Sequence, residues 1–323
     1  MQIAALGLTP TPAPRTAPDT MLYSDIDDTF IGWQEYNVGA DEVAMARTRG
    51  VLNRDAERMV NGLSTSRGLI EIQRLAPLLK GFPLAFIGAN NGQQLFVNAQ
   101  GLPSEQWIAG LRQEQTDSAW SAEVGARTGG WSVPDVMDTL RGILSEDGFS
   151  PAPPLAAPLE TLVNFTSGDK MVSFYPDQPS FAIRGTAGKL TDDHKKFGDA
   201  LASRIKDRLG ERGIQMNVRG FPYPGEQYIC LLEPKNLDKS TLLEHVLGRY
   251  PSVHHVITAG DNTNDTMLFP ERYGEVENHR VVSGDRKGVA EKFAGQPNVN
   301  TCSFGDIGPA IEAHLATIPR DRG

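Results

Sequence analysis

Residues 23–32 read YSDIDDTFIG and place three carboxylates directly after a short apolar run. The run, residues 21–24, is typical of a buried strand, and the carboxylates are those of Asp25, Asp27 and Asp28. Like charges crowded together repel one another, so a fold tolerates them at a solvated turn or where a cation or a reacting group needs them. Other parts of the chain must decide between these two readings.

A second acidic stretch has the same design. The apolar sequence VHHVITAG, residues 253–260, is followed by DNTND, which carries Asp261 and Asp265. Because the carboxyl ends of strands in an open parallel α/β sheet form the ligand crevice, two such turns from distant parts of the chain can meet at one place. Oxygen ligands from Asp, without His or Cys, suit a hard cation such as Mg²⁺.

Two further groups complete the set. Residues 64–67 read STSR and follow another predicted strand, while Lys235 and Lys239 lie just before a predicted helix. Two pairs of carboxylates, a hydroxyl and a lysine are what phosphoryl transfer through an aspartate needs, because one carboxylate attacks phosphorus, another carries the proton, and the cation neutralises charge.

The four motifs DIDDT, STSR, PKNLDKS and GDNTND occur in the order and at the separations of a known family. The chain resembles the haloacid dehalogenase superfamily of phosphatases, in the branch that has a large cap inserted between the second and third motifs. Within that branch it is similar to the sucrose-phosphatase-like and Cof-like sugar phosphatases, because DIDDTFIGWQ looks like their opening motif and KMVSFYPD like their cap strand. Asp28 stands where many relatives carry Gly or Asn, and Ser66 where the turn is usually TGR.

This resemblance implies a role for each matched residue. Asp25 matches the nucleophile that becomes the aspartyl-phosphate, and Asp27 matches the general acid and base. Thr65 matches the hydroxyl that binds the phosphate group. Lys239 matches the lysine that binds phosphate and belongs to the catalytic set.

The resemblance also implies Mg²⁺ as the cofactor. Asp261 matches a metal ligand. Asp265 matches the acidic position that supports the metal and the lysine, either by binding the metal directly or by holding a residue that does. Asp25 and the backbone carbonyl of Asp27 are expected to share the metal, and Asn264 is expected to contact phosphate.

Three basic residues leave alternatives open. Lys235 competes with Lys239, which we prefer because it matches the family position and directly precedes the helix. Arg67 is either a salt-bridging residue or a substrate ligand. In the cap, Lys170 is a candidate for contact with a sugar hydroxyl, and a structural surface lysine is the alternative.

A tandem histidine pair is a second candidate metal site. The tandem His254-His255 lies in an apolar strand pattern, and neighbours in a strand point to opposite faces of the sheet. The pair alone therefore does not predict a metal site.

The expected fold class is α/β, with a Rossmann-like parallel-sheet core and an inserted α+β cap. Strand and helix patterns alternate in residues 20–96 and again in 235–323, which predicts a parallel sheet made from both segments. Residues 97–234 are expected to form the cap, which sets substrate selectivity, and residues 1–19 a disordered Pro/Thr/Ala-rich tail. We expect helices at residues 40–61 and 192–210, strands at 84–89 and 227–233, and a proline-rich connector at 150–158.

Composition limits the partners. The 323 residues include 31 Lys and Arg against 40 Asp and Glu, a formal charge of −9, which argues against nucleic acid or an anionic membrane as the main partner. No apolar run approaches the length that spans a bilayer, and two distant cysteines, Cys230 and Cys302, do not form a disulfide framework. We expect a cytoplasmic location, with export through a non-standard N-terminal signal as the alternative that the residues leave open.

Three functions remain. The first is an Mg²⁺-dependent phosphatase that hydrolyses a small phosphorylated metabolite, most of all a sugar phosphate, through an aspartyl-phosphate. The second is a phosphosugar mutase or phosphotransferase of the same fold, which returns the phosphoryl group to a sugar. The third is a catalytically silent binding or regulatory protein, against which the presence of Asp27 argues, since a stable acyl-phosphate switch needs no proton carrier there.

Overall fold

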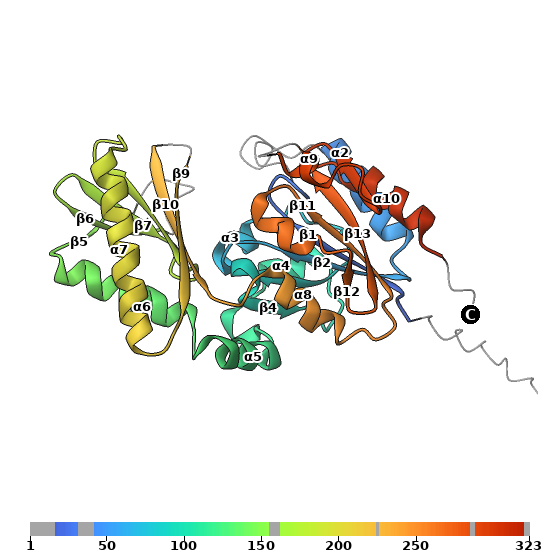
Figure 1. The fold of residues 1–323 in the computed structure, drawn as a ribbon, viewed down its shortest axis with the longest axis horizontal. Coiled ribbons are helices and arrows are strands. Elements are labelled where there is room, and N and C mark those ends of the chain that lie inside the picture. Colours follow the sequence, from blue (N-terminus) through green and yellow to red (C-terminus); the bar gives the residue numbers. More distant parts are fainter. Residues whose placement is uncertain (1–16, 32–41, 155–161, 224–225, 285–287, 320–323) are drawn as a thin grey trace, which may run out of the picture.

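Two β-sheets organise the chain, and each forms the centre of its own lobe (Figure 1). The structure is a computed structural model that describes residues 17–31, 42–154, 162–223, 226–284 and 288–319. One sheet is mainly parallel and the other is antiparallel, so the predicted α/β class with a separate α+β unit is confirmed.

The larger sheet has eight strands in the order β12-β13-β11-β1-β2-β3-β4, with β14 beside β13. Its central strand β1 is buried at every position, because it lies between β2 and β11 under helices on both faces. The parallel strands are β1 (Thr20–Asp25), β2 (Met59–Ser64), β3 (Leu84–Ala89), β11 (His255–Gly260), β13 (Val276–Ser283) and β14 (Val299–Cys302). The antiparallel strands are β4 (Gln94–Val97) and β12 (Arg272–Tyr273).

Helices cover this sheet. The pair α2 and α10 pack against each other beside it, and α8 starts where the chain returns from the second lobe (Figure 1). The helices of this lobe are α2 (Glu42–Arg54), α3 (Leu69–Arg74), α8 (Lys239–Leu247), α9 (Val289–Phe293) and α10 (Gly308–Thr317), with the short 3₁₀ turns η1 (Asn90–Gly92) and η3 (Thr263–Leu268).

The smaller sheet has six strands in the order β5-β6-β7-β8-β10-β9, each antiparallel to its neighbours. Helix α7 (Asp192–Glu211) packs on β8, β9 and β10 and on α6 (Val133–Glu146), because its apolar side chains recur every fourth residue. The strands are β5 (Ser150–Ala152), β6 (Val163–Ser167), β7 (Lys170–Phe174), β8 (Ser180–Gly185), β9 (Met216–Tyr223) and β10 (Gln227–Pro234).

Between the two sheets in sequence lie α4 (Ser104–Ala109), η2 (Gln113–Gln115) and α5 (Ser118–Thr128). They belong to the segment predicted to be inserted, yet α4 contacts α3 and α5 contacts β4. The indole Nε1 of Trp120 in α5 donates a hydrogen bond of 2.9 Å to the carbonyl of Gly92. Residues 104–128 thus extend the larger lobe before the chain enters the smaller one.

Two sequence expectations are wrong in part. The helix expected at 40–61 ends at Arg54, and β2 follows, because the segment MVNGLS is buried throughout and pairs with both β1 and β3. The connector expected at 150–158 begins instead with the edge strand β5, which tolerates Pro151 because an edge strand has one unpaired side. Residues 155–158 lie outside the described part of the chain.

Other expectations hold. The strand at 84–89 and the helix at 192–210 occur as β3 and α7. Cys230 and Cys302 are both free. Of the predicted tail, residues 1–16 lie outside the described residues, while Asp19 forms a salt bridge of 3.1 Å with Arg58 and so belongs to the folded structure. Among the helices that are described, none combines the length and the apolar character needed to cross a membrane.

Candidate active site

The carboxyl ends of β1 and β11 bring three aspartates together. The two strands pair in parallel, with Ser24 opposite Ala259, so Asp25 and Asp261 leave the sheet at the same level. Asp265, on η3, closes the group, and carboxylate oxygens of all three lie within 4.8 Å of one another. Each residue is at most 6% exposed. The two acidic motifs, more than two hundred residues apart in sequence, therefore form one cluster.

Lys239 is the cation of this cluster. Its Nζ donates hydrogen bonds to Oδ1 of Asp25 at 2.5 Å and to Oδ1 of Asp265 at 2.8 Å. The lysine is the first residue of α8, and Asp238 caps that helix by accepting from two backbone N–H groups of its first turn. Lys235, the competing candidate, is exposed. The structure thus places Lys239, rather than Lys235, beside the first aspartate.

The cluster carries more negative than positive groups. Burial raises the pKa of Asp25 well above its usual range, Lys239 opposes this, and the neighbouring carboxylates of Asp265 and Asp261 add to it. For Lys239, burial alone would lower the pKa, but the two carboxylates outweigh burial and raise it. The lysine therefore stays charged, and three carboxylates share one ammonium group.

This imbalance suits a divalent cation. Three buried carboxylates and one lysine leave two negative charges uncompensated when all are ionised, and oxygen-only ligands are those of a hard cation. Both oxygens of Asp265 already accept hydrogen bonds, from Lys239 and from the backbone N–H of Asn262 at 3.2 Å. Gly260 permits the tight turn, since a Cβ there would lie 2.3 Å from Cβ of Asp265.

Asp27 is held by Arg67. The guanidinium donates from Nη2 to Oδ1 at 2.6 Å and from Nε to Oδ2 at 2.9 Å, and it also reaches Glu71 at 3.3 Å. Arg67 is buried, whereas the side chain of Asp27 is 30% exposed. Of the two readings left open for Arg67, the structure shows the salt bridge, and its partner is the second aspartate of the first motif.

Asp28, the third carboxylate of the opening stretch, has a backbone role. Its φ is 57°, in the left-handed region that Gly and Asn adopt most easily, and its carbonyl accepts a hydrogen bond of 2.6 Å from Ser283. Asp fits this conformation because, like Asn, it adopts positive φ more readily than most residues.

The phosphate-binding candidates are only partly described. Thr65 is fully buried, its backbone N–H donates to the carbonyl of Gly88 at 2.9 Å, and its hydroxyl accepts from the N–H of Arg67 at 3.1 Å. It follows β2 at the same edge of the sheet as Asp25, which pairs with Ser64. The side chain of Asn264 lies outside the described residues.

The second lobe touches the first at this edge. In the turn after β7, Asp177 accepts a hydrogen bond of 2.7 Å from the backbone N–H of Ile70, and its carbonyl accepts one of 3.0 Å from Asn90. Gln178 donates to the carbonyl of Ser66 at 3.1 Å. Gly68 allows this approach, since a Cβ there would lie 2.9 Å from both the carbonyl and a carboxylate oxygen of Asp177. This turn belongs to the KMVSFYPD stretch, although the sequence did not reveal that it docks beside residues 64–67.

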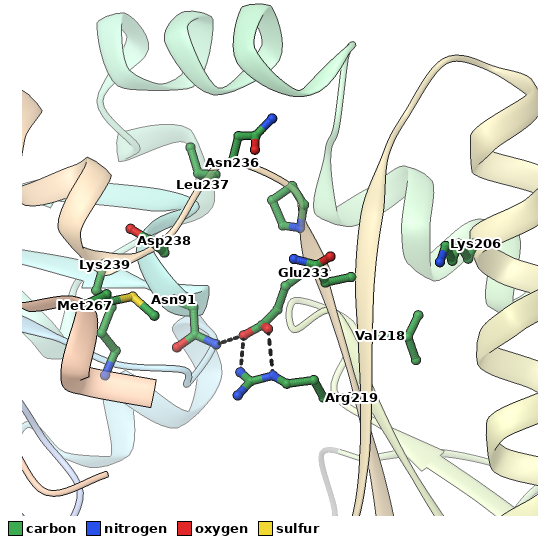
Figure 2. A pocket seen from close by; sticks show the side chains of 12 residues that line it. Asn91, Lys206, Val218, Arg219, Glu233, Asn236, Leu237, Asp238, Lys239 and Met267 are labelled. Atoms are coloured by element: carbon green, nitrogen blue, oxygen red, sulfur yellow. Dashed lines mark hydrogen bonds and ion pairs between the residues drawn. The ribbon is translucent and has the colours of Figure 1, made fainter. Parts of the chain in front are cut away.

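A cavity of about 530 Å³ opens between the lobes (Figure 2). In it, Glu233 accepts from Arg219 at 2.8 and 3.0 Å and from Asn91 of the first lobe at 2.5 Å. Lys239 lines the same cavity, so the space reaches the aspartate cluster. Arg219 and Glu233 carried no motif, and their only sequence signal is a charge in each of the strands β9 and β10.

Tyr223, the last residue of β9, also faces the first lobe. Burial raises its pKa, and the charge of Asp27 adds to that effect. Lys170, the cap candidate from the sequence, starts β7 and pairs with Asp169 at 3.2 Å. It lies about 17 Å along the strand from Tyr175, where the docking turn begins. The structure therefore does not bring Lys170 to the aspartates, and its contact with substrate stays a prediction.

Comparisons with known proteins agree with this architecture. Neither family models nor curated protein sequences match the chain. Solved structures do match: the sucrose-phosphatase from Synechocystis sp. PCC6803, solved with sucrose and phosphate, is 15% identical with a TM-score of 0.50 over 93% of this chain and 98% of that one. The chain has the haloacid dehalogenase phosphatase fold.

Two more structures with this fold cover nearly the whole chain. The subclass IIB sugar phosphatase BT4131 is 12% identical with a TM-score of 0.51, over 93% of this chain and 100% of its own. TM0651 from Thermotoga maritima is 15% identical with a TM-score of 0.50, over 94% and 98%. The resemblance expected from four short motifs is thus confirmed for the fold of both lobes.

Proposed function

We propose that this chain is an Mg²⁺-dependent phosphomonoesterase that hydrolyses a small phosphorylated metabolite, of the sugar phosphate class, through phosphorylation of Asp25. One observation carries the proposal. A buried carboxylate at the end of the central strand is held by a buried lysine, with Asp27 two residues away and the Asp261/Asp265 pair beside it. The haloacid dehalogenase fold supports it, since two structures with this fold are named as a sucrose-phosphatase and a sugar phosphatase.

In this reaction a carboxylate oxygen of Asp25 attacks phosphorus, and the bond between phosphorus and the leaving oxygen breaks. Asp27 gives its proton to the leaving oxygen, then takes a proton from the water that attacks the aspartyl-phosphate, and inorganic phosphate departs. Lys239 keeps Asp25 oriented through its 2.5 Å hydrogen bond and binds phosphoryl oxygens, as Thr65 and Asn264 do.

Mg²⁺ fits the carboxylate cluster, where Asp25, Asp261 and the backbone carbonyl of Asp27 would hold it with Asp265 in support. When bound, it supplies positive charge that lets an anionic nucleophile approach an anionic substrate. The uncompensated charge described above is the reason to expect it.

Arg67 acts on Asp27 in this proposal. Its two hydrogen bonds fix both carboxylate oxygens, so the side chain of Asp27 must release at least one of them when it carries the proton. We assign Arg67 as a positioning residue that aims Asp27 at the leaving oxygen. Glu71, which binds the same guanidinium, holds Arg67 in turn.

The second lobe is the cap, within residues 97–234, and it selects the leaving group. Amide, guanidinium and carboxylate groups of Asn91, Arg219 and Glu233 line the cavity and match the hydroxyls of a sugar. Two structures with this fold are named for sugar substrates, which supports the same class. The turn at residues 175–178 contacts Ser66 and Ile70 of the first lobe, and in this proposal it helps to exclude bulk water from the aspartates.

The experiment is a screen of phosphorylated metabolites, ranked by kcat/KM, with orthophosphate as the product measured. The panel includes sucrose, trehalose, glucose and mannosylglycerate phosphates and an aryl phosphate. We expect orthophosphate release with Mg²⁺, loss of release with EDTA, and a sugar phosphate as the best substrate. Activity that survives chelation would contradict the metal assignment, and transfer to a sugar without orthophosphate would show a mutase.

A further inference from the structure

A second group of metal-ligand side chains lies at the opposite end of the larger sheet. His255 begins β11, while Glu277 and His279 lie two residues apart on the neighbouring strand β13. The two strands pair in parallel with His255 opposite Glu277, and alternate residues of a strand share one face. His255 is about 20 Å along its strand from Asp261, so this group is separate from the aspartate cluster.

The distances within the group match those of a tetrahedral site. Nδ1 of His255 lies 3.3 Å from Nε2 of His279 and 3.5 Å from a carboxylate oxygen of Glu277, and one ligand atom of each residue lies within 4.8 Å of the others. A zinc ion bonded to nitrogen at about 2.0–2.1 Å in tetrahedral geometry separates its ligand nitrogens by about 3.3 Å. The two separations from His255 are therefore close to those around one bound ion.

The burial of His279 and the orientation of Glu277 also suit a metal site. His279 is 4% exposed, and its Nε2 faces Nδ1 of His255. Asn298 donates a hydrogen bond of 2.7 Å to Oε1 of Glu277, and the Oε2 atom faces His255. A carboxylate fixed by such a neighbour is typical of metal ligands.

We propose that His255, Glu277 and His279 form a Zn²⁺ site that ties β11 to β13 at the amino end of the sheet. Three protein ligands leave the fourth tetrahedral position to water, and the 19% and 39% exposure of the His255 and Glu277 side chains gives the ion a path from solvent. The tandem His254-His255 contributes one ligand only, because His254 points away, and the others come from a strand that the sequence did not link to it. The site stabilises the fold and takes no part in the phosphoryl transfer.

The test uses Co²⁺ as a spectroscopic probe on the full chain, with excess Mg²⁺ to fill the aspartate cluster. Nitrogen ligands in tetrahedral geometry give Co²⁺ strong visible absorption, which all-oxygen octahedral sites do not. We expect one equivalent of Co²⁺ to produce these bands, and one equivalent of Zn²⁺ to remove them. The Asp261→Asn variant, altered at the other cluster, should give the same bands.

Matched variants separate the site from general metal binding. His255→Gln and Glu277→Gln, both at partly exposed positions, should weaken Zn²⁺ binding by at least about 100-fold, more than the loss of an outer-shell partner. His254→Gln, at the exposed neighbouring position, should bind Zn²⁺ as the unaltered chain does. Zn²⁺ should also raise the melting temperature of the unaltered chain and of His254→Gln. It should leave the melting temperatures of His255→Gln and Glu277→Gln unchanged.

Two outcomes would overturn the proposal. The first is the absence of tetrahedral bands with Co²⁺ in the unaltered chain. The second is equal Zn²⁺ affinity in His255→Gln and His254→Gln. Either would show that the three side chains form only a hydrogen-bonded group.

Discussion

The edge of the larger sheet and the facing surface of the second lobe are built in opposite ways. At the edge, Asp25, Asp265 and Lys239 are buried and hold one another in a single network. Across the cavity, the pair Arg219 and Glu233 lies in a wide polar space, and the side chain of Arg219 is 40% exposed. A buried network cannot lose one member without leaving others unpaired, whereas an exposed polar surface can change freely. In the proposed function, the chemistry is therefore fixed at the edge, and selectivity can vary across the cavity from it.

The largest effect is expected at Asp25, the proposed nucleophile. Asp25→Asn should lower kcat by at least about 10⁴-fold on every substrate, since an amide has the shape of the carboxylate but is a poor nucleophile. The matched control is Asp28→Asn, three residues along, where Asn suits the positive φ and activity should stay within about threefold. Orthophosphate release by both variants gives the comparison, and near-native activity of Asp25→Asn would refute the covalent mechanism.

Lys239→Ala tests whether the edge is one network. Removing the ammonium leaves buried carboxylates without a partner, so urea unfolding without metal should show a loss of about 3–5 kcal/mol. Mg²⁺ should restore part of that stability by neutralising the same carboxylates, while turnover of sugar and aryl phosphates falls together. The exposed Lys235→Ala is the control. A Lys239→Ala protein as stable as Lys235→Ala would mean that the cluster is not held by charge.

Arg219→Ala tests whether the surface of the second lobe contacts the sugar part of the substrate. It should lower kcat/KM for the best sugar phosphate by about tenfold and leave an aryl phosphate unchanged, because a truncated substrate never makes the contacts that are lost. Arg204 in α7, a half-buried residue paired with Asp147, is the matched control, because its side chain is 41% exposed, close to that of Arg219. Equal losses on both substrates would show that Arg219 is structural.

The smallest effect is expected at Lys170. Because this residue pairs with Asp169 far along β7 from the docked turn, Lys170→Ala should change kcat/KM by less than about twofold on either substrate. A loss confined to the sugar phosphate would establish the contact with substrate that the sequence suggested.

The aspartate cluster at the edge of the larger sheet could be predicted from the sequence, because both of its acidic motifs lie where a strand ends. Parallel strands carry their carboxyl ends to one edge, so Asp25 and Asp261 had to be close once both strands were recognised. Arg67 could not be assigned in this way, since its partner depends on side-chain direction rather than on strand order.

The failures have physical causes as well. The helix expected at 40–61 overlaps the first half of β2, because polar Asn61 is buried there and donates to the carbonyl of Pro83 at 3.2 Å, so no alternation marks the start of the strand. The group around His279 needs the register of β11 against β13, which no local pattern reveals. Contacts between the lobes, such as Asn91 with Glu233, likewise depend on how two separately folded sheets meet.

The most direct test of the central claim is to trap the phosphorylated enzyme. An aryl phosphate with a good leaving group needs little proton donation, so Asp27→Asn should still allow Asp25 to be phosphorylated but slow the attack of water, which needs a base, by about 10²–10⁴-fold. With labelled substrate and an acid quench, the label should accumulate on the peptide that contains Asp25 in Asp27→Asn. No label should appear in the Asp25→Asn, Asp27→Asn double variant. An unlabelled single variant, or a label on any other residue, would contradict the account.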